Sequence, residues 1–170
     1  MPTIFTHPAV ALTRPWFGDL PRGAVLAAVA GSIVPDLDVI AFHFGIPYAS
    51  PYGHRGITHS LLFAFVYSLL AALLLRTRRA FPFVFLCAVS HTLLDAMTNG
   101  GLGVALLAPF SNERFFFPWR PIRLSPIGAR FFSERGLAVL VSEAIWVWAP
   151  CVGLGLFGKY VAQRERKGRQ

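Results

Sequence analysis

The sequence predicts an all-α membrane protein, a polytopic helical bundle of about four transmembrane helices with short re-entrant or interfacial pieces. Hydrophobic residues make up 55% of the 170 residues, and charged residues only 14%, against about 25% in a typical soluble domain. The mean hydropathy is +0.55. A globule this small cannot bury so much apolar surface, but a bilayer can cover it. Helices are expected because unpaired backbone groups are too costly in lipid.

Four apolar segments are candidate spans: residues 23–44, 57–75, 80–97 and 137–158. Each approaches the ~20 residues that a helix needs to cross the hydrocarbon. Pro35, Asp36 and Asp38 interrupt the first. The apolar piece 102–110 is too short to span and is expected to be re-entrant or interfacial, whereas the proline-rich stretch 118–126 is expected to be an ordered loop over the bundle.

Basic residues flank these spans and give a net charge of +8. By the positive-inside rule, the turn 76–79, the basic tail 159–170 and the N-terminus are cytoplasmic. The opposite loop also carries five arginines, which reduces the difference in positive charge between the two sides of the membrane: Arg114, Arg120, Arg123, Arg130 and Arg135. Because the charges flank spans instead of forming a stripe, the expected partners are membrane lipids and no nucleic acid, with the oligomeric state open. Residues 1–170 are predicted to form a single domain.

Ionisable residues inside apolar spans are the informative ones. They fall late in the first span, around the entrance to the second and in the second half of the third: Asp36, Asp38, His54, His59, His91 and Asp95. If the spans alternate direction, all three groups lie at the same end of the bundle. His91 and Asp95 are four residues apart and so share one helical face, whereas His54 fits a loop and His59 the first turn of a helix.

Imidazole with carboxylate is the ligand set of zinc, manganese or iron sites, so we predict a divalent metal ion, zinc or manganese first, with two ions possible. Any one of these side chains could instead be hydrogen-bonded to a neighbouring helix. Burying several carboxylates without a cation is costly, however, which favours metal for the set. Glu143 could hold a metal ligand in place, relay protons, or simply be hydrogen-bonded to neighbouring helices of the bundle. Ser60 is expected to cap a helix and His43 to end a span.

Three motifs resemble a known family: PDLD at 35–38, GHRGITHS at 53–60 and SHTLLDAMTNGG at 90–101. They are similar to the bacterial family described as LexA-regulated, membrane-bound, predicted metal-dependent hydrolases. The early Thr6-His7 and the loop PWRPIRLSP at 118–126 also look like that family. The resemblance implies a multi-pass protein of the bacterial inner membrane, with supporting roles for Arg55 and Thr58. It implies metal-site roles for His7, Asp36, Asp38, His54, His59, His91 and Asp95.

The function predicted is metal-assisted hydrolysis, with a catalytic set of Asp36, Asp38, His54 and Arg55. An aspartate acts as general base, and Arg55 with Arg120 and Arg123 favours a phosphoester or lipid-like anionic small molecule. Anchoring to anionic lipid is the alternative for these arginines. The rival functions are a proton- or ion-coupled transporter, which needs polar residues at several depths, and a non-catalytic scaffold stapled by metal. With a cytoplasmic N-terminus, His7 reaches the other ligands only through a short re-entrant helix or an extra half-span.

Overall fold

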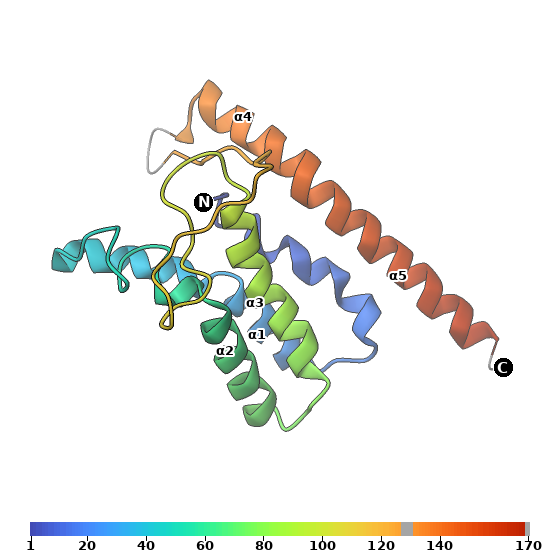
Figure 1. Cartoon of the computed structure of the whole chain (residues 1–170). Helices are drawn as coiled ribbons and strands as arrows, with labels where there is room; N and C mark the ends of the chain where they lie inside the picture. The colour runs from blue at the N-terminus through green and yellow to red at the C-terminus, as the bar shows by residue number, and fades with distance from the viewer. Residues whose placement is uncertain (127–130, 169–170) are drawn as a thin grey trace.

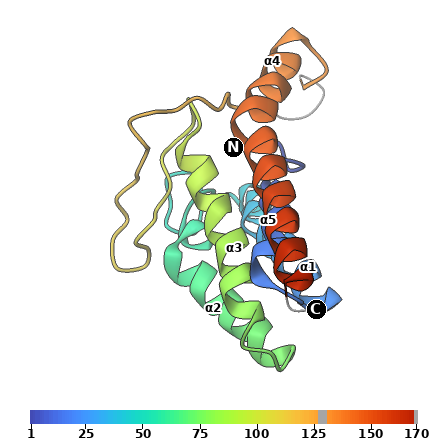
Figure 2. The ribbon, with the colours of Figure 1, turned by 90° about the vertical axis from the view of Figure 1, so that its right-hand side faces the viewer.

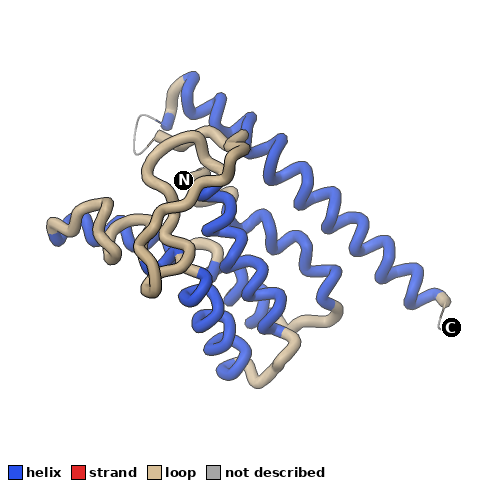
Figure 3. Tube along the Cα trace, viewed as in Figure 1, coloured by secondary structure: helices blue, strands red, loops and turns tan. Residues whose placement is uncertain are grey.

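The computed structural model describes residues 1–126 and 131–168, and its regular structure is helical, as predicted (Figures 1 and 3). Within these ranges the β pairing is limited to two isolated bridges, Thr98 with Ile122 and Val104 with Phe115. Arg130 and the last two residues of the predicted basic tail, Arg169 and Gln170, lie outside the described residues.

The helices follow one another as η1 (His7–Phe17), α1 (Arg22–Gly31), η2 (Val34–Phe44), η3 (Ile57–His59), α2 (Leu61–Leu74), α3 (Ala80–Ala96), α4 (Glu134–Glu143), η5 (Ala144–Trp148) and α5 (Ala149–Lys167). The last three are continuous and form a single rod of 34 residues. Figures 1 and 2 show this rod along one side of a bundle made by η1, α1, α2 and α3.

One helix of the described chain, Glu134–Lys167, is long and apolar enough to cross a membrane alone. The pair α1 and η2 passes the same test together but is bent by about 40°. The segment 23–44 is therefore two helices, because Pro35 has no backbone N–H to continue the first. With 14 and 17 residues, α2 and α3 are shorter than a full span. The structure thus gives one or two candidate spans, and four spans remain a prediction.

The apolar core lies around the N-terminal half of α3, where α1 and η1 pack against it. Its fully buried members include Ala24, Ala28, Phe83 and Val84. The alanines on α1 let the backbones of α1 and α3 approach closely. Helices in membranes often pack in this way, because the hydrophobic effect does not drive helices together within lipid. Cys87 and Cys151 are buried and free, as expected for small apolar residues.

The first residues of the chain lie at the opposite end of the molecule from the basic tail (Figure 1). Thr3 and Thr6 donate hydrogen bonds from their hydroxyls to the Glu143 carboxylate, at 2.7 and 2.8 Å. Lys167 lies 24 residues further along a continuous helix, or about 36 Å at the α-helical rise. A rod of this length that crossed a membrane would put the N-terminus and the tail on opposite sides, which conflicts with the prediction that both are cytoplasmic. Of the three roles predicted for Glu143, these contacts fit the third, a buried carboxylate that is hydrogen-bonded within the bundle.

The loop between α3 and α4 folds back over the bundle. Ile122 is fully buried, and its N–H donates to the Met97 carbonyl, so the ordered loop predicted at 118–126 is confirmed. The apolar piece 102–110 contains no helix. It is instead fixed by backbone hydrogen bonds from Ala105 to Arg55 and from Leu61 to Leu106.

A glycine on α5 sets the distance between that helix and η1. A Cβ atom built on Gly155 would lie 2.5 Å from the Leu12 carbonyl oxygen, whereas one on Gly153 meets nothing within 4 Å. We expect Gly155→Ala to destabilise the protein by about 1–3 kcal/mol, because the backbones must move apart. The matched Gly153→Ala change should be neutral or stabilise by up to ~1 kcal/mol through helix propensity. Thermal unfolding in detergent compares the two, and equal melting temperatures would contradict close packing here.

Candidate metal centre

Five ionisable side chains meet inside the bundle at the C-terminal end of α3. They come from η1, η2, η3 and α3 and are all buried: His7, Asp36, His59, His91 and Asp95. The three groups predicted to lie at one end of the bundle are therefore brought together. His7 joins them, because η1 begins at this end and runs away from it along α5.

Local sequence places each of the central residues. Asp36 follows the break between α1 and η2, in the first turn of η2. His59 ends the short helix η3, directly before α2 and not within it. Ser60 then caps α2 by accepting a hydrogen bond from the Phe63 N–H at 3.0 Å, as predicted. His91 and Asp95 lie one turn apart on α3, so both face the same point.

The spacing of four ligand atoms fits a metal ion. The His59 Nε2 atom lies 3.7 Å from Asp36 Oδ1 and 3.4 Å from Asp95 Oδ2. The His91 Nε2 atom lies 3.6 Å from Asp36 Oδ1. All four residues offer ligand atoms within 4.8 Å of one another. Nitrogen and oxygen ligands of a tetrahedral zinc ion, at 2.0–2.2 Å from the metal, lie about 3.3–3.6 Å apart.

The two imidazoles face each other through nitrogens that should carry lone pairs. His91 Nδ1 is 2.8 Å from the Ser32 carbonyl oxygen, to which it must donate. His59 Nδ1 is 3.2 Å from Asp38 Oδ2 and is best used as a donor there. The Nε2 atoms of these two rings are nevertheless only 2.9 Å apart. Two lone pairs at that distance require a proton or a metal ion between them.

His7 faces the other oxygen of each carboxylate. Its Nε2 atom lies 3.7 Å from Asp36 Oδ2 and 3.9 Å from Asp95 Oδ1, and its ring stacks on His91 at 3.9 Å. Asp36 and Asp95 therefore present one oxygen to the His59 and His91 nitrogens and one to His7. Seven buried atoms here lack a hydrogen-bond partner among the described residues: His7 Nδ1 and Nε2, both carboxylate oxygens of Asp36 and of Asp95, and Arg55 Nε.

Asp38 and His54 form a separate pair beside this cluster. Asp38 Oδ1 lies 2.6 Å from His54 Nδ1, while its Oδ2 accepts from the Thr58 hydroxyl at 2.7 Å and the Arg55 N–H at 3.2 Å. With His59, these two residues make a second group that could hold a metal ion. The Asp38 oxygens are already satisfied, however, which suits a carboxylate that orients a ligand histidine.

His54 lies where the site comes nearest to the surface, with 9% of its side chain exposed. Its ring stacks on Tyr48 at a centroid distance of 5.2 Å. Burial raises the pKa of the Tyr48 phenol, so that this ring stays neutral beside the imidazole.

Arg55 is fully buried, and its guanidinium is bound to other groups of the protein. Its Nε lies 3.0 Å from Asp95 Oδ2, and its other nitrogens donate to the Thr98 hydroxyl and the Leu102 carbonyl. Its backbone φ of 63° lies in the left-handed region, which is costly for a residue with a side chain. The guanidinium therefore has no free edge for a substrate and instead fixes Asp95.

Arg114 holds the loop that carries His54 and Arg55, and sequence reasoning missed it. Its guanidinium donates to five carbonyl oxygens, those of Tyr48, Ser50, His54, Arg55 and Gly103. A lone arginine in a polar loop carries no motif, so nothing in its sequence context indicates this role.

The charges of the cluster call for a cation. Three carboxylates, Asp36, Asp38 and Asp95, are opposed by the guanidinium of Arg55. With neutral imidazoles this leaves two negative charges uncompensated in a buried site, and one divalent ion balances them. Uncompensated buried charge is strongly destabilising, so the residues present fit a divalent metal ion.

Comparison with known proteins identifies the family of this chain. The YdjM inner membrane protein family matches residues 2–166. The chain is 41% identical over 168 residues to the inner membrane protein YbcI of Escherichia coli strain K12, covering 93% of this chain and 96% of the relative. No solved structure matches the chain. The chain therefore belongs to the YdjM inner membrane protein family, which confirms the resemblance and an inner-membrane location.

Proposed function

We propose that this member of the YdjM inner membrane protein family is a membrane-bound metal-dependent hydrolase. The observation that carries the proposal is the set of buried ligand atoms on His7, Asp36 and Asp95 that make no hydrogen bond within the described residues, next to two imidazole nitrogens 2.9 Å apart. Buried polar groups are almost always hydrogen-bonded, and clusters of exceptions point to a missing ion or a functional role.

In this proposal Asp36, His59, His91 and Asp95 hold the ion, with zinc or manganese the best match to imidazole and carboxylate donors. When bound, a divalent ion would supply a nucleophile at neutral pH by lowering the pKa of a water molecule to about 7. Asp38 holds His59 with its Nε2 toward the site, and Arg55 holds Asp95 in place. These two are positioning residues and do not touch the substrate.

His54 is the residue we assign to proton transfer. The Asp38 carboxylate binds its Nδ1 at 2.6 Å, which fixes the ring and leaves Nε2 as the proton acceptor. The imidazole–carboxylate pair is the usual arrangement of a general base near neutral pH. Asp36 and Asp38, the bases expected from sequence, are less suitable, because one faces the ion site and the other is saturated with hydrogen bonds.

An anionic, lipid-like phosphoester is the substrate class we favour. One divalent ion neutralises the cluster. A second ion, on the His7 side of the shared carboxylates, would leave an excess of positive charge that phosphate oxygens could balance. Two-metal sites with shared carboxylates are common among enzymes that cleave phosphoesters.

A transport function is disfavoured by where the buried polar groups lie. Beyond the metal end, buried polar side chains of the described residues include Thr13 and Ser68. Both are uncharged and donate to carbonyls of their own helices, at 2.7 Å. The ionisable side chains needed for a proton or ion path at several depths are replaced there by the apolar core around Phe83.

The test is turnover by metal-loaded protein in detergent on a panel of phosphomonoesters, phosphodiesters and carboxylic esters. We expect His54→Ala to retain the metal content of the wild type but to lose hydrolysis by about 10²–10⁴-fold, the usual contribution of a general base. His43→Ala is the matched control, because His43 is exposed and belongs to neither group of candidate metal ligands. Metal binding without turnover on any ester would instead favour the scaffold.

A further inference from the structure

A groove between α2 and α3 runs along α2 to the end that is remote from the metal centre. It has a volume of about 720 Å³. Four apolar side chains and two arginines define what we call the arginine-capped groove: Phe65, Leu69, Leu73, Arg76, Arg78 and Phe81. From His59 to the end of α2 is about 21 Å at the α-helical rise, so this groove is separate from the catalytic proposal.

The apolar part of the groove has the shape of a channel along the helix. Phe65, Leu69 and Leu73 repeat every four residues on one face of α2 and are all exposed, at 45%, 40% and 64%. Phe81 closes the side, packed edge-on against Phe65 at 5.5 Å. The channel runs for about 12 Å from Phe65 to Leu73, and in a bilayer such a surface is filled by acyl chain.

The mouth of the groove carries uncompensated positive charge. Arg76 and Arg78 are exposed, and their side chains make no ion pair or hydrogen bond to the residues that the structure describes. No acidic residue lines this groove. Two guanidiniums that line one end of an apolar channel match a lipid phosphate followed by its chains.

The backbone at Arg76 adds an independent observation. The Arg76 N–H donates to the Leu73 carbonyl and the Thr77 N–H to the Ala72 carbonyl, both at 3.1 Å. This is the Schellman ending of a helix, in which the residue at the Arg76 position is usually glycine. Arg76 has a φ of 52°, which glycine adopts at no steric cost. An arginine is therefore less favourable than glycine for the backbone of this turn. Any stabilising contribution of Arg76 must come from its side chain.

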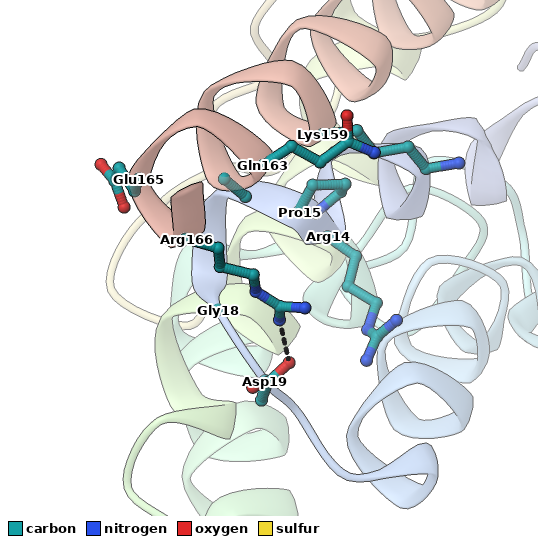
Figure 4. Close-up of a pocket in the computed structure, with 9 residues that line it drawn as sticks. Arg14, Pro15, Gly18, Asp19, Lys159, Gln163, Glu165 and Arg166 are labelled. Carbon is teal, nitrogen blue, oxygen red and sulfur yellow. Dashed lines mark hydrogen bonds and ion pairs between the residues drawn. The ribbon is translucent and has the colours of Figure 1, made fainter. Parts of the chain in front are cut away.

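A second basic pocket, between η1 and the end of α5, provides the contrast (Figure 4). Its volume is about 420 Å³, and its charges are mixed. Figure 4 shows Arg166 directed at Asp19, an ion pair of 3.3 Å, and Glu165 also lines the pocket. Arg14 is engaged with the Leu20 carbonyl. For binding an anion, this pocket therefore has fewer unpaired positive charges than the arginine-capped groove, and it has no apolar channel.

We propose that the arginine-capped groove binds one anionic phospholipid, with its phosphate between Arg76 and Arg78 and an acyl chain along Phe65, Leu69 and Leu73. The proposal rests on the inner-membrane location and on this geometry, and it is independent of hydrolysis. It places an anchoring lipid at the end of the bundle remote from the metal ligands.

The experiment titrates purified protein in detergent with dioleoyl phosphatidylglycerol or dioleoyl phosphatidylcholine and counts bound lipid by native mass spectrometry. We expect the wild type to retain phosphatidylglycerol in preference. Arg76→Gly should weaken that binding about fivefold, the effect of one basic residue at a membrane surface, and adding Arg78→Gln about 25-fold. Because glycine suits the turn, Arg76→Gly should keep or raise the melting temperature, so unfolding cannot explain the loss.

The matched control is Arg166→Gln, which removes an exposed arginine of the other pocket and should leave lipid binding unchanged. Equal retention of the two lipids, no bound lipid, or an unaltered Arg76→Gly variant would each overturn the proposal. Displacement of the lipid by soluble glycerol phosphate at similar concentration would show a phosphate site without the acyl channel, and would overturn it as well.

Discussion

Protein with Asp36 replaced by alanine should purify without stoichiometric metal, whereas the wild type should hold at least one divalent ion per chain. Asp36 offers Oδ1 to both His59 and His91 and Oδ2 to His7, so one substitution removes an oxygen from each side of the site. We expect the metal affinity to fall by more than the roughly 10–100-fold that follows loss of a ligand's hydrogen-bond partner. Elemental analysis after chelation and reloading measures the ion and its stoichiometry.

Two matched aspartates serve as controls for this result. Asp38→Asn should retain the metal with an affinity about 10–100-fold weaker, because Asp38 orients His59 but does not face the ion. Asp19→Asn should bind as the wild type does, since Asp19 is a surface residue with 89% of its side chain exposed. Metal-free wild-type protein after reloading would refute the metal centre and, with it, the hydrolase proposal. Full metal content in the Asp36 variant would refute the ligand assignment.

Most of the metal cluster could be predicted because it depends on helix periodicity and on span order. His91 and Asp95 are four apart on an α-helix, so their shared face follows from the repeat of 3.6 residues. Asp36 and His59 each adjoin a helix end, and alternation of direction brings such ends together. His7 could be assigned only by resemblance, since its position depends on η1 lying against α5, which no local pattern encodes.

The roles within the cluster could not be predicted in the same way. Asp38 and Asp36 are the same residue type two positions apart, yet one accepts three hydrogen bonds and the other none. That difference arises from the turn of η2 and the left-handed backbone at Arg55, both tertiary features. Arg55 was expected to meet a substrate, but burial turns it inward to Asp95. Helix lengths were also misjudged, because the apolar segments 23–44 and 57–75 continue across Pro35 and Ser60, where the structure has helix ends.

Replacing Arg55 with alanine should lower the free energy of unfolding by about 3–5 kcal/mol in metal-free protein. The side chain is fully buried, and its Nε lies 3.0 Å from the buried Asp95 carboxylate. Removing one partner of a buried ion pair leaves the other charge uncompensated, which accounts for penalties of this size. The change also removes the donors to the Thr98 hydroxyl and the Leu102 carbonyl. Equilibrium unfolding in mixed micelles with increasing denaturing detergent measures the loss.

The comparison variants separate charge from geometry. Arg55→Lys should recover little of the loss, because a lysine cannot reproduce contacts in three directions from one planar group. Arg120→Ala should cost less than about 0.5 kcal/mol, since Arg120 is exposed and lies over the Phe116 ring. A penalty at Arg55 no larger than that at Arg120 would show that Asp95 needs no compensating charge.

Saturating metal should reduce the Arg55→Ala penalty, and this links the stability of the fold to the proposed centre. An ion bound to Asp95 supplies the positive charge that the guanidinium otherwise provides, and ligand that binds only the folded state adds stability. Metal should therefore stabilise the Arg55 variant by more than it stabilises the wild type. For Asp36→Ala, which lacks a ligand, metal should add almost nothing. An equal rise in melting temperature on metal binding in the wild type and the Arg55 variant would mean that Arg55 and the ion do not share Asp95.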